Sequence, residues 1–303
     1  MNLSTNLCGI KIDNPTILAS GILGVTKSSL KNIAKNGAGA VTMKSISKEP
    51  RKGHPNPIIT TFEAGMMNAV GYSNPGIEEA KKEFVDLKDV GAPVIASIIG
   101  STADDFAYMA KRFLTDEFAA VEIPLSCPHT PGFGTLAGQG TPKATSDITK
   151  AVVKNTKLPV FVKVSPNIPK LADVAKAAEE AGAAAITAIN TAGPGMIINI
   201  ETGKPILANK FGGVSGPAIK PIAVRCVYDI YKAVKIPIIG LGGINTGRDA
   251  IEMMMAGATA VGIGTGIYYR GPEIFKKVAD EIKEFMKEQD YKNLKEIIGI
   301  AHE

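Results

Sequence analysis

One of the three cysteines directly follows an apolar, strand-like run, a position from which its thiol could take part in chemistry. Cys127 follows directly after the apolar run 120–125, in the short segment Ser-Cys-Pro-His. A thiolate beside a cation can act as a nucleophile or a general base. Cys8 precedes a strand-like run and Cys226 lies within a helical stretch, so both are expected to pack as small apolar side chains. Cys127 is therefore the candidate base or nucleophile.

Two lysines interrupt apolar runs and must be held there by something polar. Lys44 ends the run 40–44, and Lys163 lies within the run 159–165. Moving an ammonium group out of water costs free energy unless it meets an anion or a polar ligand. A structural ion pair would also satisfy one lysine, but two lysines near strand ends favour a shared ligand.

Glycines follow the last two strand-like runs and could present backbone N–H groups to a phosphate. Gly242 and Gly243 end one run, and Gly264 precedes Thr265 at the end of the next. Both turns lead into helical stretches, whose starts attract anions, and these two turns form the usual phosphate site of a barrel. The glycines at 212–216 could add donors. Close packing at a rim, or a flexible loop, would also explain such glycines.

Amide and hydroxyl side chains gather in two further loops. Asn190 and Thr191 end the run 185–190, and Asn68 begins the stretch 68–72. These groups suit a planar ligand with ring N–H and C=O groups. Turn formation is the competing explanation, and it is strong for Asn74, which precedes a proline.

The elements that must position these residues alternate between short apolar runs and longer amphipathic stretches, as parallel βα units do. Because nearly every run is apolar on both faces, the pattern favours a closed (β/α)8 barrel, with a doubly wound sheet as the second choice. Strands are predicted at 16–20, 40–44, 93–98, 120–125, 159–165, 185–190, 237–242 and 260–264. Helices are predicted at 28–36, 103–114, 171–181, 219–234 and 246–255, with a last barrel helix and a charged C-terminal helix over 273–298.

Length and composition agree with one large α/β domain. The chain has 303 residues, of which 45% are hydrophobic and 21% charged, and barrels commonly use about 250 residues or more as one unit. We expect a single domain over 1–303, with long loops at 45–74, 126–141 and 191–216 on the carboxyl side of the barrel. The net charge of +5 is dispersed along the chain, so we expect no nucleic-acid partner.

Neither a membrane segment nor a metal site is expected. No apolar stretch of the sequence approaches the about 20 residues that cross a bilayer, and residues 1–20 lack the pattern of a signal peptide. The three cysteines are far apart and show no metal-ligand spacing. Such a chain fits a reducing compartment, and we expect a cytoplasmic protein.

Taken in order, these motifs resemble the class 1 dihydroorotate dehydrogenases along nearly the whole chain. The segments most similar to the NAD-linked 1B group are Asn68-Ala69-Val70-Gly71, Ser126-Cys127-Pro128 and Lys163-Val164-Ser165-Pro166-Asn167. The other matching segments are Ala19-Ser20-Gly21, Lys44-Ser45, Ile189-Asn190-Thr191, Ser215-Gly216-Pro217-Ala218, Gly242-Gly243 and Gly264-Thr265. The resemblance implies an FMN-dependent oxidation of dihydroorotate to orotate in pyrimidine (UMP) biosynthesis, with one FMN per subunit.

The resemblance also implies a role for each matching residue. In that chemistry a base takes the C5 proton, hydride passes from C6 to flavin N5, and a lysine stabilises the reduced flavin. Cys127 matches the base and Lys163 the lysine. The residues implied to bind FMN are Ser20, Lys44, Ser45, Lys163, Ile189, Gly216, Gly242, Gly243, Gly264 and Thr265. The residues implied to bind substrate are Lys44, Asn68, Ala69, Val70, Gly71, Tyr72, Asn190 and Thr191.

A partner protein follows from the same resemblance. The 1B group passes electrons to NAD through a subunit that carries FAD and a 2Fe-2S cluster, and this chain lacks the cysteines for such a cluster. We therefore expect a homodimeric core and a heterotetramer with that electron-transfer subunit.

The sequence departs from the family pattern at three positions beside the expected site. Pro124 replaces an asparagine that contacts flavin and substrate, His129 replaces a second asparagine, and Ser97 stands where an asparagine often helps to bind flavin. Proline has no side-chain donor, so a related dihydropyrimidine-type substrate is an alternative. A non-redox phosphosugar enzyme and a barrel that only binds flavin or serves as a scaffold are further alternatives.

Overall fold

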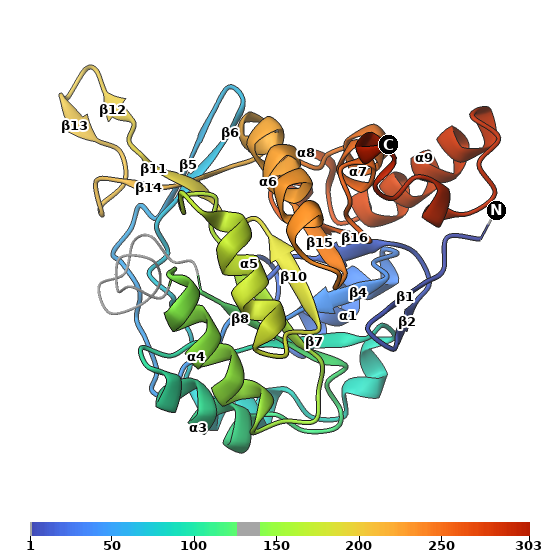
Figure 1. Ribbon diagram of the computed structural model, residues 1–303. Helices are drawn as coiled ribbons and strands as arrows, with labels where there is room; N and C mark the ends of the chain where they lie inside the picture. Colours follow the sequence, from blue (N-terminus) through green and yellow to red (C-terminus); the bar gives the residue numbers. More distant parts are fainter. Residues whose placement is uncertain (1, 126–139) are drawn as a thin grey trace.

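The computed structural model describes residues 2–125 and 140–303, and within them eight parallel strands close into a barrel (Figure 1). Their order around the barrel is β10-β15-β16-β3-β4-β7-β8-β9. The strands are β3 (Thr16–Leu18), β4 (Ala40–Thr42), β7 (Val94–Ser97), β8 (Ala120–Pro124), β9 (Val160–Val164), β10 (Ala185–Ala188), β15 (Ile238–Leu241) and β16 (Ala260–Ile263). The predicted barrel is confirmed, with each strand inside its predicted range, and the doubly wound alternative is wrong.

The helices cover the outside of the barrel and pack against their neighbours in chain order, as the green and yellow helices of Figure 1 show. Two of them begin with a capping box, in which Thr102 and Thr246 each exchange hydrogen bonds with an aspartate three residues later. The helices are α1 (Lys27–Lys35), α2 (Ile77–Glu83), α3 (Ala103–Phe113), α4 (Pro142–Val153), α5 (Leu171–Glu180), α6 (Lys220–Ala233), α7 (Gly247–Met255), α8 (Gly266–Arg270) and α9 (Ile274–Glu288).

Near the amino ends of its strands, the barrel interior is packed by small and large side chains that alternate strictly around the barrel. Each strand contributes one buried residue, and around the barrel from β10 these are Ala185, Ile239, Ala260, Ile17, Ala40, Ile95, Ala120 and Phe161. Alternation lets neighbouring residues interdigitate without voids, as expected for barrel layers built from alternate strands. The antiparallel pair β1 (Thr5–Leu7) and β2 (Ile10–Ile12) inserts Leu7 and Ile12 into the same cluster and closes this end.

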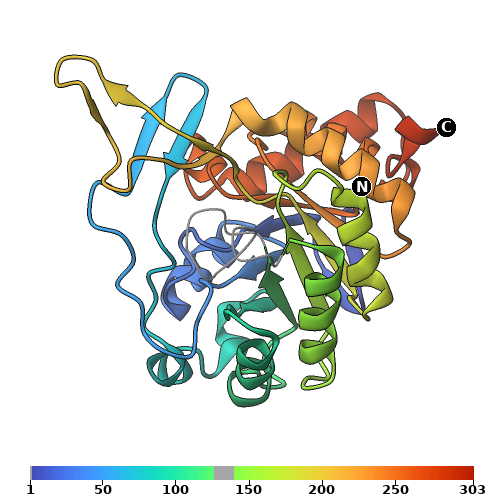
Figure 2. The ribbon, with the colours of Figure 1, turned by 60° about the vertical axis from the view of Figure 1, so that its left-hand side comes forward.

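Two of the long loops form a second sheet at the other end of the barrel. Its order is β11 (Ala192–Gly195), β14 (Gly212–Ser215), β6 (Gly65–Asn68) and β5 (Ile59–Phe62). A short hairpin of β12 (Ile198–Asn199) and β13 (Lys204–Pro205) extends beyond it on the same side of the molecule (Figures 1 and 2). These strands were not among the predicted ones.

The C-terminal segment differs from its prediction. The expected last barrel helix is α9, but it ends at Glu288, and the predicted charged C-terminal helix is absent from the described chain. Short 3-10 turns at Leu294–Glu296 and Ile300–His302 take its place. Asp290 (φ 58°) and Gly299 (φ 79°) adopt left-handed backbone conformations, which interrupt a helix.

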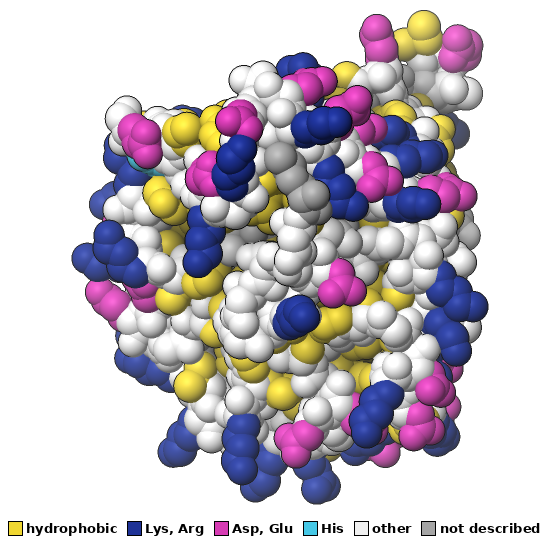
Figure 3. All heavy atoms as spheres, turned by 90° about the vertical axis from the view of Figure 1, so that its right-hand side faces the viewer, with side chains coloured by type: hydrophobic (Ala, Val, Ile, Leu, Met, Phe, Trp, Pro, Cys, Tyr) yellow, Lys and Arg dark blue, Asp and Glu magenta, His cyan; other side chains and the backbone are white. Residues whose placement is uncertain are grey.

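Charges of both signs are interspersed on the surface drawn in Figure 3, which agrees with their dispersal along the sequence. In the part of the chain that the structure describes, no helix is both long and apolar enough to span a bilayer.

The importance of this packing for stability can be tested at Phe161, the largest side chain of the alternating layer. Phe161→Ala should lower the free energy of unfolding by about 3–5 kcal/mol, because it removes a fully buried ring and leaves a cavity among side chains that cannot move together. Phe211→Ala, at an exposed position, is the control and should cost about 0.5 kcal/mol. Chemical denaturation measures both values, and similar losses in the two variants would contradict the packing argument.

Candidate active site

A single cavity at the carboxyl end of the barrel is lined by every predicted FMN and substrate residue. From the barrel side these are Ser20, Lys44, Ser45, Lys163, Ile189, Gly216, Gly242, Gly243, Gly264 and Thr265, and from the loops Asn68, Ala69, Val70, Gly71, Tyr72, Asn190 and Thr191. The structure thus brings together segments that are far apart in sequence. Which of these residues contact a flavin, and which a substrate, stays a prediction.

The predicted base, Cys127, lies outside the described residues, as does His129. The chain leaves strand β8 at Pro124, which itself lines the cavity and stands opposite Lys163 in the strand register. Cys127 follows Pro124 by three positions in the sequence.

The glycine turns after β15 and β16 have room for a ligand on one side and contacts on the other. A side chain at Gly243 would come within 2.6 Å of Lys220, and one at Gly242 within 2.7 Å of Ala223. At Gly264 a Cβ atom would meet only Ala19, at 3.6 Å. Gly242 and Gly243 also have positive φ angles of 139° and 74°. The turn after β15 therefore needs glycine, and both turns line the cavity with glycine backbone, as a phosphate requires.

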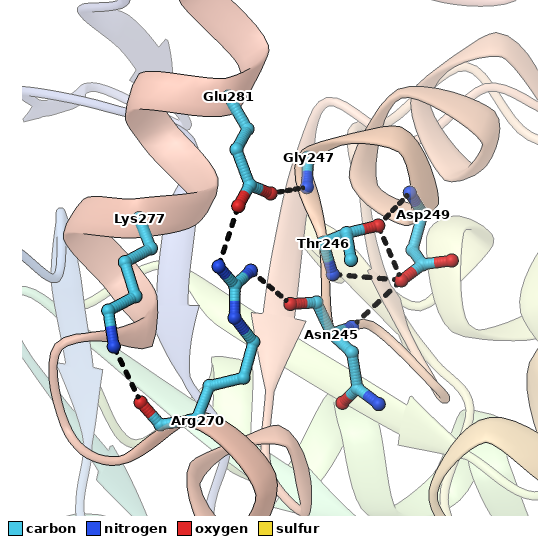
Figure 4. Close-up of polar contacts among 7 residues, drawn as sticks. All are labelled: Asn245, Thr246, Gly247, Asp249, Arg270, Lys277 and Glu281. Atoms are coloured by element: carbon cyan, nitrogen blue, oxygen red, sulfur yellow. Dashed lines mark hydrogen bonds and ion pairs between the residues drawn. The ribbon is translucent and has the colours of Figure 1, made fainter.

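A polar network behind these turns ties them to helices α7, α8 and α9 (Figure 4). Arg270 donates to the carbonyl oxygen of Asn245 at 2.8 Å and forms an ion pair with Glu281 at 2.7 Å. Glu281 accepts the N–H of Gly247. Asp249 accepts the N–H groups of Asn245 and Thr246, at 3.0 and 2.8 Å. The turn after β15 is thus held from both sides.

Both acids of the network favour their charged form. Burial alone would raise the pKa of Glu281, but the hydrogen bonds from Arg270 and from the Gly247 N–H hold it below its ordinary value. Burial likewise opposes the charge of Asp249, and the hydrogen bond from Lys220, with those from the backbone, lowers its pKa. Both carboxylates are therefore ionised at neutral pH.

Above the apolar layer, five neighbouring strands of the barrel present buried polar side chains. They are Thr42 on β4, Ser97 on β7, Glu122 on β8, Lys163 on β9 and Thr187 on β10. Each stands two positions beyond a member of the apolar layer, so it faces the same interior. These residues form the polar floor beneath the cavity.

Two hydrogen-bonded groups connect this polar floor to the cavity. The Ser20 hydroxyl donates to Glu122 Oε1 at 2.7 Å, and Lys163 Nζ donates to Ser20 Oγ at 3.2 Å. Separately, Ser45 Oγ and Ser97 Oγ lie 2.8 Å apart in a buried contact. Ser97 therefore interacts with a predicted flavin residue.

The sequence reasoning missed Glu122, although the signal was present. It is an acid in the middle of an apolar strand, and the argument applied to Lys44 and Lys163 applies to it equally. Residues with no such signal also line the cavity, among them Ile59 and Met66 of the β5–β6 hairpin and Leu241 of β15. Their presence depends on how the long loops fold, which their residue types do not reveal.

The loops that carry amide groups reach the cavity through tight turns. Gly71 and Tyr72 both have positive φ angles, of 73° and 58°, and a side chain at Gly71 would come within 2.7 Å of His54. Asn190 Oδ1 accepts the N–H of Thr191 at 2.9 Å, which orients its amide. These turns allow several polar groups to converge on one small ligand.

Comparisons with known proteins agree on one family. The family model described as "Dihydroorotate dehydrogenase" matches residues 2–286. The chain is 50% identical to a "Dihydroorotate dehydrogenase B (NAD(+)), catalytic subunit" from Methanocaldococcus jannaschii, over 99% of this chain and 98% of that protein. It is 45% identical to the protein of the same name from Methanothermobacter thermautotrophicus, over 99% of both.

A solved structure supports the same conclusion at lower identity. The chain is similar to the protein in a crystal structure of DHODH in complex with ferulenol from Eimeria tenella, with a TM-score of 0.82 and 26% identity. The similarity covers 99% of this chain and 88% of the other.

The network behind the glycine turns predicts a pH-dependent loss of stability in Glu281→Gln. Because the folded-state pKa of Glu281 lies below its ordinary value of 4.5, its carboxylate stabilises the fold above about pH 4.5, and this contribution is lost as the pH falls through the lowered pKa. At pH 7 we expect a loss of about 0.5–1 kcal/mol, since both partners are partly exposed and solvent screens the pair.

Urea denaturation of wild type and variant between pH 7 and pH 3.5 measures this difference. It should shrink as the pH falls below about 4.5. Glu288→Gln, at the exposed end of α9, is the control and should show no such trend. A constant difference over the whole range would contradict the argument.

Proposed function

The chain belongs to the dihydroorotate dehydrogenase family, and from this premise we propose that it oxidises dihydroorotate to orotate, a step of pyrimidine biosynthesis, with FMN as cofactor. One observation carries the proposal. The residues that match the family's flavin and substrate positions, within the described chain, all line one cavity at the carboxyl end of the barrel.

The residues at the cavity fit an FMN molecule. Gly242, Gly243, Gly264 and Thr265 would hold the phosphate through backbone N–H groups and a hydroxyl, since all four line the cavity and a Cβ atom at Gly264 would meet only Ala19, at 3.6 Å. The buried ammonium of Lys163 and the hydroxyls of the polar floor suit the polar edge of a flavin ring. When bound, FMN supplies the acceptor for the hydride that leaves the substrate.

The protein's own groups would orient the substrate and remove its proton. Lys44 is buried at the cavity wall and suits the carboxylate of dihydroorotate. Asn68, Asn190 and Thr191 offer donors and acceptors for its ring amides. Cys127 would take the proton from C5, with Lys163 beside the flavin pyrimidine edge, where it favours negative charge.

We propose that electrons leave through a partner subunit. The relatives from both methanogens carry the words "catalytic subunit" and "NAD(+)" in their names, which implies a second subunit and NAD use. An FAD and a 2Fe-2S cluster on that subunit, a homodimeric core and a heterotetramer are the finer form of the proposal. Three scattered cysteines favour a reducing compartment, so we place the enzyme in the cytoplasm.

One observation favours a second candidate substrate. Pro124 lines the cavity and has no polar side-chain group, and the Ser97 hydroxyl is engaged with Ser45. A dihydropyrimidine with fewer groups to satisfy on this side would fit equally well.

Anaerobic mixing with dihydroorotate tests the proposal directly. Purified protein should be yellow, and its flavin absorbance near the visible maximum should bleach when dihydroorotate is added. Bleaching by dihydrouracil should be at least about tenfold slower, because dihydrouracil has no carboxylate for Lys44 to bind. Faster bleaching with dihydrouracil would favour the second substrate, and colourless protein that binds no FMN would overturn the flavin assignment.

The base is tested by Cys127→Ala. This variant should keep its FMN but reduce it at least about 100-fold more slowly at neutral pH, because the proton at C5 has no acceptor. Cys226→Ala is the matched control, since burial raises the pKa of the Cys226 thiol to about 11 and leaves it protonated at neutral pH. Stopped-flow absorbance measures both rates. Undiminished reduction in Cys127→Ala would reject this residue as the base.

A further inference from the structure

A buried glutamate in the polar floor is not explained by the binding of substrate or of phosphate. Glu122 lies in the middle of strand β8 with 4% of its surface exposed, and Lys163, on the adjacent strand, is 5% exposed. An uncompensated buried charge is strongly unfavourable, so each of these two charged groups needs a polar partner or an opposite charge nearby.

The partner they share is the Ser20 hydroxyl. A hydroxyl has one proton to donate and two lone pairs that accept. Ser20 donates that proton to Glu122 and accepts from Lys163. Glu122 therefore fixes the direction of the Ser20 hydroxyl, and Ser20 turns one N–H bond of Lys163 toward the floor. Lys163 also lines the cavity, so the same ammonium can donate to a ligand there.

We propose that Glu122 is a positioning residue that sets the reduction potential of the bound flavin through Ser20 and Lys163. The inference rests on the proposed function, because it needs a flavin above the floor. Reduction adds negative charge to the pyrimidine edge of a flavin, and Lys163 stabilises that charge. The Glu122 carboxylate, one hydroxyl away from Lys163, offsets the ammonium and keeps the potential lower than Lys163 alone would set it.

Glu122→Gln is the variant that isolates charge from shape. Glutamine retains an oxygen that can accept the Ser20 hydroxyl, but it carries no charge. Its flavin midpoint potential should rise by about 30 mV or more, which for a two-electron couple is a tenfold greater preference for the reduced flavin. Glu117→Gln is the matched control. Glu117 precedes the same strand at its amino end, is exposed and accepts the N–H of Leu87 at 2.7 Å. Its potential should equal that of wild type.

The potentials are measured anaerobically by dye equilibration on the FMN-loaded protein. An unchanged potential in Glu122→Gln, or a shift equal to that of Glu117→Gln, would overturn the proposal and leave Glu122 a structural residue. This failure differs from failure of the proposed function, in which wild-type protein would bind no FMN or would not bleach with dihydroorotate. Wild-type protein that binds no FMN would also end the inference. Wild-type protein that binds FMN but does not bleach with dihydroorotate would leave the inference standing as a property of the flavin site.

A second measurement, on the protein without FMN, covers the case in which Glu122→Gln folds but binds too little FMN for its potential to be measured. The variant leaves the ammonium of Lys163 without its buried counter-charge, whereas Glu122→Gln/Lys163→Met removes both charges. The double variant should unfold at a higher denaturant concentration than the single one. A double variant that is no more stable than the single would show that the two charges are not coupled, and the proposal would fall.

Discussion

Two opposite charges buried inside the barrel, on Glu122 and Lys163, constrain the rest of the site. Neither charge can leave the interior, because each stands in the middle of a strand whose other residues pack against helices or the opposite wall. Their contact through Ser20 ties strands β8 and β9 to the turn that follows β3, at the level where the cavity begins. The cavity wall above them is thus set by electrostatics as much as by packing.

The apolar layer inside the barrel and the polar network beside the cavity support two different parts of the site. The alternating small and large residues fill the lower barrel and keep water from the charges above it. The tie from Arg270 to Asn245 and Glu281 holds the turn after β15 against α9. Neither group lines the cavity. Together they make the floor and the phosphate edge rigid, so that ligand binding need not order them.

The sequence predicted the barrel because its repeating signal is strong. It predicted the cavity residues because they lie in the loops that follow predicted strands or, like Lys163, within a strand. It could not predict the sheet built by β5, β6, β11 and β14, because β6 pairs with β14, from Asn68 with Gly213 to Met66 with Ser215, and pairing so far apart in the sequence leaves no local periodicity. The charged segment after Glu288 looked helical, but left-handed backbone at Asp290 and Gly299 divides it into turns. Glu122 could have been found by the reasoning that singled out Lys163.

The two departures from the family pattern that the structure describes lie on neighbouring strands, so they remove polar groups from one side of the cavity only. Ser97 on β7 turns its hydroxyl to Ser45, and Pro124 on β8 offers an apolar ring. The amides that remain, at Asn68 and Asn190, come from β6 and from the end of β10. Under the proposed function, a planar ring would then be recognised by those two loops. Positive φ angles shape the turn at Gly71 and Tyr72, whereas the N–H of Asn190 is tied to the barrel by a hydrogen bond of 2.8 Å to Val164 of β9. Under the proposed function, substrate preference would depend on these two loops together with Lys44, whereas the hydrogen bonds that join Lys163, Ser20 and Glu122 involve neither Ser97 nor Pro124.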